Sequence, residues 1–88
     1  MPKPKKQGQL DRTVNNASFL MNGEGVSYQM SSIATSIWHQ CDGYTETDKL
    51  VTNTMKTMDL KRDERIAAKT SLNQIIVKLN DLGLISSG

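Results

Sequence analysis

Residues 30–50 read MSSIATSIWHQCDGYTETDKL, and this stretch decides the fold because it holds two helices and the turn between them. A serine at its start can cap the first helix, since a short hydroxyl accepts a hydrogen bond from an early backbone N–H. The apolar residues that follow at helical spacing are Ile33, Ala34, Ile37, Trp38 and Cys41. Glycine readily adopts the left-handed conformation found after a helix, so Asp42-Gly43 predicts the end of a helix over residues 31–42.

A second helix is predicted directly after this turn. Either Thr45 or Thr47 can cap it, and the acidic Glu46 and Asp48 fall near its N-terminus, where negative charge is favoured. Its predicted buried stripe consists of Leu50, Val51, Thr54 and Met58. We therefore expect this helix to end at about residue 58.

The longest helical pattern lies downstream, over residues 63–82. Six apolar residues share one arc when each position is rotated by about 100°. They are Ala68, Leu72, Ile75, Ile76, Leu79 and Leu82. Gly83 predicts the end of this third helix, and Leu84-Ile85 is expected to pack back on the core or to add a final short strand.

The chain before residue 30 has the signals of a β-hairpin. Residues 17–21 are rich in β-capable side chains. The sequence Asn22-Gly23-Glu24-Gly25 then predicts a turn, because Asn-Gly supplies the positive φ values of a tight hairpin. Residues 26–30 form the second strand of this hairpin, and residues 11–14 are expected to add a shorter strand.

The strand after the turn alternates apolar and polar residues. Its members are Val26, Ser27, Tyr28, Gln29 and Met30. The three apolar residues share one face and the two polar residues share the other, because successive side chains of a strand point to opposite faces. The pattern predicts a strand that is buried on one side.

The first nine residues, MPKPKKQGQ, differ in composition from the rest. They contain two prolines, one glycine and three lysines and no acidic residue, which predicts a disordered basic tail over residues 1–9. The predicted domain, residues 10–88, holds the remaining 8 basic residues and 9 acidic residues, a net charge of −1. Domains that bind duplex DNA usually carry a concentrated basic face, so we do not expect a nucleic-acid partner.

Residues suited to catalysis or metal binding are scarce. Cys41 is the single cysteine and His39 the single histidine, so the chain can form neither an internal disulfide nor a zinc site. The two lie two positions apart on one helix and do not face each other, which argues against a thiol nucleophile with a histidine base. We interpret Cys41 as buried and His39 as a surface or boundary residue, and we expect no catalytic residue, no metal and no cofactor.

The sequence carries no signal for a membrane. No stretch approaches the roughly 18 apolar residues of a membrane span, and no apolar segment follows the N-terminal lysines. We therefore expect a cytoplasmic protein without a membrane partner.

The third helix has a second stripe beside its core face. Its members are Ile66, Thr70, Asn73 and Val77, with Lys69 at the border. The four lie within about 60° of one another. One interpretation is a core boundary with ordinary solvent-facing residues. The other is one wall of a groove for an extended peptide, with the strand over residues 26–30 as the second wall, because an open strand edge can accept another strand.

The order of these motifs resembles the PqqD-like family, named after pyrroloquinoline quinone biosynthesis protein D. The resemblance covers residues 14–86 and rests first on Ile37-Trp38, Cys41-Asp42-Gly43 and Leu50. Downstream it rests on Leu72, Ile75-Ile76, Leu79 and Gly83-Leu84-Ile85. This chain departs from the family at Ser31, where asparagine is common, at Gln40, where the family prefers an apolar residue, and in a longer stretch over residues 55–70.

The resemblance implies an α+β fold of the winged helix-turn-helix type, with a small three-stranded antiparallel sheet packed on three helices. Domains of this family, called RiPP recognition elements, bind the leader segment of a ribosomally synthesised precursor peptide. The leader adds as a strand to the third strand of the sheet and packs on the third helix. The family thus implies a non-catalytic adaptor that presents its precursor to a separate modifying enzyme, often a radical S-adenosylmethionine enzyme.

Together, the stripe and the resemblance predict the peptide-binding residues. From the strand they are Val26, Ser27, Tyr28, Gln29 and Met30, and from the third helix Ile66, Lys69, Thr70, Asn73 and Val77. Two alternatives stay open: a winged-helix regulator that binds DNA through the third helix, and a structural subunit that only stabilises an enzyme.

Overall fold

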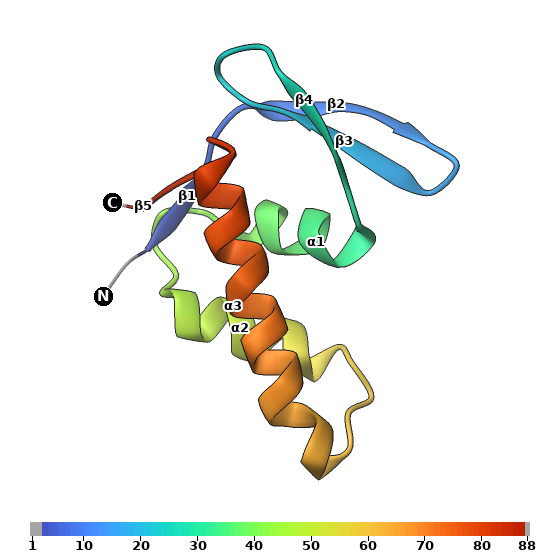
Figure 1. Ribbon diagram of the computed structural model, residues 1–88. Helices are drawn as coiled ribbons and strands as arrows, with labels where there is room; N and C mark the ends of the chain where they lie inside the picture. Colours follow the sequence, from blue (N-terminus) through green and yellow to red (C-terminus); the bar gives the residue numbers. More distant parts are fainter. Residues whose placement is uncertain (1–2, 88) are drawn as a thin grey trace.

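The computed structural model describes residues 3–87, which form two small sheets and three helices (Figure 1). In chain order the elements are β1 (Pro4–Lys6), β2 (Gln9–Val14), β3 (Ala17–Met21), β4 (Ser27–Met30), α1 (Ser32–Gln40), α2 (Thr47–Lys56), the 3₁₀ turn η1 (Arg62–Glu64), α3 (Arg65–Asp81) and β5 (Ile85–Ser87). The predicted α+β architecture, with a three-stranded antiparallel sheet on three helices, is confirmed. The extents of 40 × 34 × 17 Å leave room for one sheet layer on one helical layer.

The three-stranded sheet has the order β2-β3-β4, so β3 is central. Leu20 of β3 lies opposite Tyr28 of β4, and the Leu20 side chain is fully buried. The turn between β2 and β3 consists of Asn15 and Asn16, with φ values of 49° and 68°. Two positive φ values are typical of a two-residue type I′ turn, which asparagine tolerates better than most residues. The strand expected over residues 11–14 is therefore part of a longer β2.

The second sheet joins segments that are far apart in the sequence. β1 pairs antiparallel with β5, and Lys6 lies opposite Ile85. β1 also bonds to the turn after α1: the Lys6 N–H donates to the Cys41 carbonyl at 2.8 Å, and the Gly43 N–H donates to the Pro4 carbonyl at 3.0 Å. These bonds attach β1 to the helical layer on one side and to the end of the chain on the other.

The expectation of a disordered tail over residues 1–9 therefore needs correction. Residues 4–6 form β1 and Gln9 begins β2, while residues 1 and 2 lie outside the described part. Composition led to the expectation because this segment has few apolar side chains. Backbone hydrogen bonds can nevertheless hold such a segment as a strand, and local composition carries no information about distant partners. The folded unit thus begins before residue 10.

The helices agree with the predicted ones to within a few residues. α1 begins after Ser31, whose Oγ accepts a hydrogen bond from a backbone N–H of the first turn at 3.2 Å. α2 begins at Thr47, and Glu46 rather than a threonine occupies the N-cap position. η1 precedes α3, and Gly83, with φ of +75°, follows its end as predicted.

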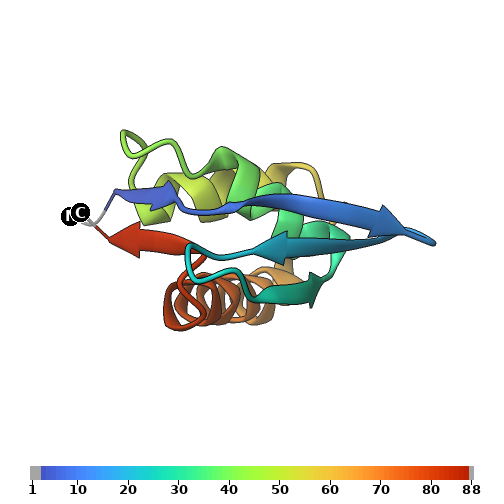
Figure 2. The ribbon, with the colours of Figure 1, turned by 90° about the horizontal axis from the view of Figure 1, so that it is seen from above.

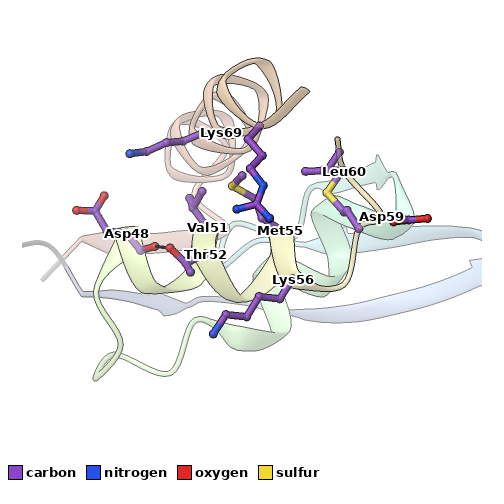
Figure 3. A pocket seen from close by; sticks show the side chains of 10 residues that line it. Asp48, Val51, Thr52, Met55, Lys56, Asp59, Leu60 and Lys69 are labelled. Atoms are coloured by element: carbon purple, nitrogen blue, oxygen red, sulfur yellow. Dashed lines mark hydrogen bonds between the residues drawn. The ribbon is translucent and has the colours of Figure 1, made fainter. Parts of the chain in front are cut away.

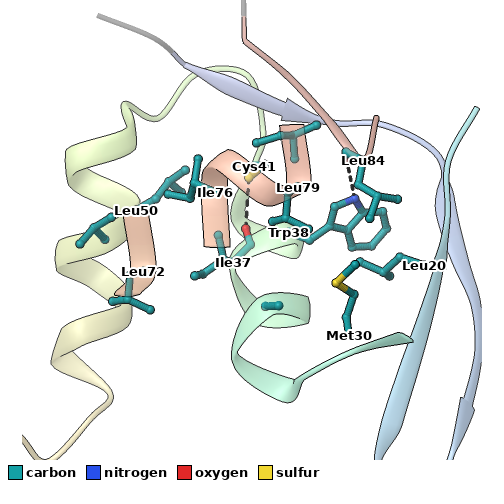
Figure 4. Close-up of a cluster of buried hydrophobic side chains, with 13 residues drawn as sticks. Leu20, Met30, Ile37, Trp38, Cys41, Leu50, Leu72, Ile76, Leu79 and Leu84 are labelled. Carbon is teal, nitrogen blue, oxygen red and sulfur yellow. Dashed lines mark hydrogen bonds between the residues drawn. The ribbon is translucent and has the colours of Figure 1, made fainter. Parts of the chain in front are cut away.

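The core lies where α1, α2, α3 and the sheets meet (Figure 4). Its buried apolar residues are Leu20, Met30, Ala34, Ile37, Trp38, Cys41, Leu50, Val51, Leu72, Ile76, Leu79, Leu84 and Ile85. All three predicted helical stripes contribute to this set. Ile33 is the exception in the first stripe, because 39% of its surface is exposed.

Trp38 joins three segments of the chain through one N–H group. Its indole Nε1–H donates to the Leu84 carbonyl at 2.9 Å and to the Gln7 carbonyl at 3.3 Å. The Gln7 N–H donates to the same Leu84 carbonyl at 2.8 Å. The Lys6 ammonium lies 5.3 Å from the indole centroid, within the range of a cation–π interaction. The indole thus holds the β1–β2 and α3–β5 connections against α1.

Gly8 connects β1 to β2 at a point that leaves no room for a side chain. Its φ is +75°, and a Cβ atom there would lie 1.9 Å from the Met21 carbonyl oxygen. We expect Gly8→Ala to lower the free energy of unfolding by about 2 kcal/mol or more, measured by urea denaturation, because strain and clash add.

Gly23→Ala is the matched control, because a Cβ atom at Gly23 would meet nothing within 4 Å. It should change the free energy of unfolding by less than about 0.5 kcal/mol. Equal losses at Gly8 and Gly23 would contradict the close approach of the β1–β2 connection to β3.

Candidate peptide-binding groove

β4 is an edge of the three-stranded sheet, so one side of its backbone has no strand partner in the described chain. The Asn22 N–H donates to the Val26 carbonyl at 2.9 Å, which makes these two a hydrogen-bonded pair of the hairpin. In an antiparallel ladder such pairs alternate with pairs whose N–H and C=O groups point away from each other. Every second residue from Val26 onward therefore points its backbone at β3. The residues between them, Ser27 and Gln29, point their N–H and C=O groups outward.

The C-terminal half of α3 lies beside this open edge. Seen from above, β4 is the strand of its sheet nearest to α3, and β2 is the farthest (Figure 2). A cavity of about 170 Å³ between them is lined by Gln29, Met30, Ser31, Ala34, Ile75, Lys78 and Leu79. Met30, Ala34 and Leu79 are buried, Ile75 is half-buried and Lys78 is exposed. The strand edge thus opens onto a small apolar cavity.

A second cavity, of about 390 Å³, continues along both elements. Its lining residues are Gln7, Asn22, Gly23, Glu24, Tyr28, Asn80, Asp81, Leu82 and Gly83. On β4 the lining passes from Gln29 to Tyr28, and on α3 from Leu79 to Asn80. We call the two cavities together the β4–α3 groove. Its first part is apolar, and its second part contains the carboxylates of Glu24 and Asp81.

Asn22 holds one end of the groove together. Its side chain is only 8% exposed and uses both ends of its amide. Nδ2 donates to the Leu82 carbonyl at 2.8 Å, and Oδ1 accepts from the N–H groups of Glu24 and Val26 at 3.0 and 3.1 Å. One buried amide therefore connects the β3–β4 turn to the C-terminus of α3 and sets their separation.

The strand residues predicted to bind a peptide lie at the groove or beside it. Tyr28, Gln29 and Met30 line it. Ser27 supplies outward backbone groups, while its Oγ donates to an Asp11 carboxylate oxygen at 2.9 Å. Val26 precedes β4 and is 44% exposed. The predicted strand thus begins one residue later than expected.

The helix residues predicted for the same groove lie elsewhere. They are Ile66, Lys69, Thr70, Asn73 and Val77, and none of them lines either cavity of the groove. By helix rotation they lie about 120° to 220° from Ile75, on the side of α3 away from β4. Ile66 and Val77 are 80% and 60% exposed there. Thr70 and Asn73 donate hydrogen bonds to carbonyls of their own helix at 3.1 and 3.0 Å.

This difference has a physical cause. Periodicity shows that a stripe lies beside the core face, but it does not show which neighbouring element each flank of the helix faces. The α3 residues that line the apolar cavity are Ile75, Lys78 and Leu79. Ile75 and Leu79 belong to the predicted core arc, and a helical wheel does not separate covered core positions from those at an open margin. Nothing in the sequence pattern indicated that Lys78 would line the cavity.

The thiol of Cys41 donates its hydrogen bond to the Ile37 carbonyl at 3.2 Å and not to His39. Burial raises the pKa of the Cys41 thiol to about 11, with a further contribution from the negative charge of Asp42, so little thiolate exists at neutral pH. His39 is exposed and lies edge-on to the neighbouring indole, with ring centroids 4.9 Å apart. Hydrogen bonds from the N–H groups of Tyr44 and Thr45 lower the pKa of Asp42, which holds the turn after α1.

Residues 3–87 have neither a metal-binding cluster nor a membrane-spanning helix. No group of three or more His, Cys, Asp or Glu side chains in this range could hold a metal ion. None of the helices formed by these residues has the length and apolar character to cross a bilayer.

Comparison with known proteins adds one similarity of fold. No family model matches the sequence, and no curated protein gives a significant match. Among solved structures, TbiB1 in complex with the TbiA(beta) leader peptide matches this chain with a TM-score of 0.68. The match covers 93% of this chain and 94% of that chain, at 12% sequence identity. At this identity the similarity establishes a shared α+β fold.

The outward and inward backbone groups of β4 should differ in hydrogen exchange. We expect the amides of Tyr28 and Met30 to be protected, and those of Ser27 and Gln29 to exchange at least about tenfold faster, because only the first two bond to β3. Exchange followed by NMR checks this pattern. The amide of Leu20 on central β3 is the internal control and should be protected. Uniform protection along β4 would show that its outer edge is covered.

Proposed function

We propose that this protein is a non-catalytic adaptor that binds the leader segment of a ribosomally synthesised precursor peptide and delivers it to a separate modifying enzyme. The leader would add as a strand to β4 and pack on α3. The observation that carries the proposal is an unpaired strand edge that opens onto an apolar cavity. The shared fold with a chain bound to a leader peptide supports it, as does the resemblance to the PqqD-like family. That resemblance favours a radical S-adenosylmethionine enzyme as partner, and we propose a cytoplasmic location for the adaptor.

Strand addition requires outward backbone groups at regular spacing, and Ser27 and Gln29 supply them. An antiparallel leader would exchange hydrogen bonds with these two residues. Its residues opposite Tyr28 and Met30 would then point to the helical side of the sheet, into the β4–α3 groove. Backbone bonds would define the register of the leader, and two side chains placed two positions apart would define its specificity.

The two parts of the groove differ in chemistry, which restricts the leader residues they accept. Near Met30 the lining from α1 and α3 is apolar and suits one aliphatic or aromatic side chain. Near Tyr28 the carboxylates of Glu24 and Asp81 favour a basic or polar side chain. In an antiparallel leader the apolar residue precedes the basic residue by two positions.

The same observations weigh against the alternatives. A winged-helix regulator would place α3 in the major groove of DNA, with its basic residues toward the phosphates. The basic residues of α3 are Arg65, Lys69 and Lys78, and the two lysines point from opposite sides of the helix. A structural subunit would have no need of an open strand edge beside an apolar cavity.

Calorimetric titration with leader segments of precursor peptides encoded beside this gene tests the strand addition. We expect Gln29→Pro to lower leader affinity by at least about tenfold, because proline removes an outward N–H that the leader needs. Proline is tolerated on an edge strand where its nitrogen faces away from the ladder, so pairing with β3 should survive. Gln29→Ala is the control and should retain affinity within about twofold. Folded, monomeric protein that binds no such leader would overturn the adaptor proposal.

A pair of truncations on α3 tests which side of the helix the leader contacts. Ile75→Ala should weaken leader binding about fivefold or more, because Ile75 lines the apolar cavity. Val77→Ala removes an aliphatic side chain from the other side of the helix and should leave the affinity unchanged. A loss at Val77 without a loss at Ile75 would restore the groove predicted from the sequence alone.

A further inference from the structure

A larger cavity, of about 680 Å³, lies between α2 and α3 (Figure 3). It is lined by Asp48, Val51, Thr52, Met55, Lys56, Met58, Asp59, Leu60, Arg65 and Lys69. We call it the α2–α3 cavity, and it shares no lining residue with the β4–α3 groove. Lys69 lines the cavity and Lys78 lines the groove; nine positions along a helix are about two and a half turns, so they point from opposite sides of α3.

The floor of the α2–α3 cavity is apolar. Val51 is buried, and Met55, Met58 and Leu60 are half-buried. Two of these four residues are methionines, whose unbranched and flexible side chains adapt to the shape of a partner. Ile66, the neighbour of Arg65 on α3, is 80% exposed but does not line the cavity. An apolar surface of this kind, framed by polar residues, is typical of a protein interaction site.

Charged side chains surround this floor. They are Asp48, Lys56, Asp59, Arg65 and Lys69, and none of them has an ion-pair partner among residues 3–87. Asp48 and Asp59 lie at opposite ends of the cavity, and Lys69 extends from α3 on the side that faces α2 (Figure 3). Arg65 lies four residues before Lys69, so two unpaired cations line one wall. Carboxylates are the groups that such cations bind most strongly, and arginine binds them with two parallel hydrogen bonds.

We propose that the α2–α3 cavity is a second binding surface, which takes an apolar side chain of a partner protein flanked by carboxylates. The methionines would contact the apolar side chain, and Arg65 and Lys69 would pair with the carboxylates. This step rests on the proposed function, which makes the modifying enzyme the partner. The leader and the enzyme would then occupy opposite sides of α3, so that both are bound at the same time.

The test compares two identical charge reversals on one helix. The probes are the purified modifying enzyme and the leader segment encoded beside this gene, and the readouts are the association rate constant for the enzyme and the dissociation constant for the leader. Lys69→Glu should lower the enzyme association rate about tenfold and flatten its salt dependence, because an attractive cation becomes a repulsive anion. Leader affinity should stay within about twofold. Lys78→Glu is the matched control and should leave the enzyme association rate unchanged.

Several outcomes would overturn the inference. Equal slowing by Lys69→Glu and Lys78→Glu would indicate a general effect of net charge rather than a local surface. An unchanged association rate in the double variant Arg65→Glu, Lys69→Glu would show that these two cations do not contact the enzyme. If the enzyme does not bind the unsubstituted chain, the modifying enzyme is not the partner of this cavity. All the substituted residues are exposed, and circular dichroism checks the fold of each variant. Failure of the unsubstituted chain to bind leader would instead refute the proposed function. The measurements with the enzyme would still test whether the α2–α3 cavity is a binding surface.

Discussion

The buried indole N–H of Trp38 is the interaction on which the arrangement of the two sheets depends. It donates to carbonyls of Gln7 and Leu84, which belong to the connections that lead into the three-stranded sheet and into β5. Because Gln7 also bonds to Leu84, these connections and α1 meet at one point. An apolar ring of similar size at this position would fill the space but remove the indole N–H, and the Leu84 carbonyl would keep only the Gln7 N–H as donor. The same contact point places β4 beside α3. β4 belongs to the sheet that the Gln7 connection leads into, and α3 ends just before Leu84.

Elements whose signals are local could be predicted from the sequence. The alternation before Met30 and the glycine after α3 identified β4 and the end of that helix, because backbone preference acts within a few residues. β1 could not be predicted, since Pro4 lies opposite Ser87 and the bonds that hold it come from the far end of the chain. The turn at Asn15-Asn16 could in principle be predicted, because asparagine tolerates positive φ values. Two asparagines nevertheless indicate a tight turn less strongly than Asn-Gly does.

The candidate site divides in the same way. Its strand half follows from the alternation, whereas its helix half depends on the direction in which α3 is rotated against its neighbours. Ile66 and Val77 form a real stripe that the core does not use, but this stripe turns away from β4 and toward solvent. Beside its buried face, α3 lines the β4–α3 groove on one flank and the α2–α3 cavity on the other. A long helix of this kind can present two separate surfaces without enlarging the core, because each surface uses a different flank of the same helix.

The buried amide of Asn22 has a thermodynamic consequence for any ligand of the groove. Its three hydrogen bonds fix the β3–β4 turn to the last turn of α3 before a ligand arrives. A site that is already in its bound shape loses little conformational entropy on association, so more of the contact energy is retained as affinity. The flexible ligand would then lose most of the conformational entropy on binding. Its amino-acid composition, rather than that of the groove, would determine the affinity and the lifetime of the complex.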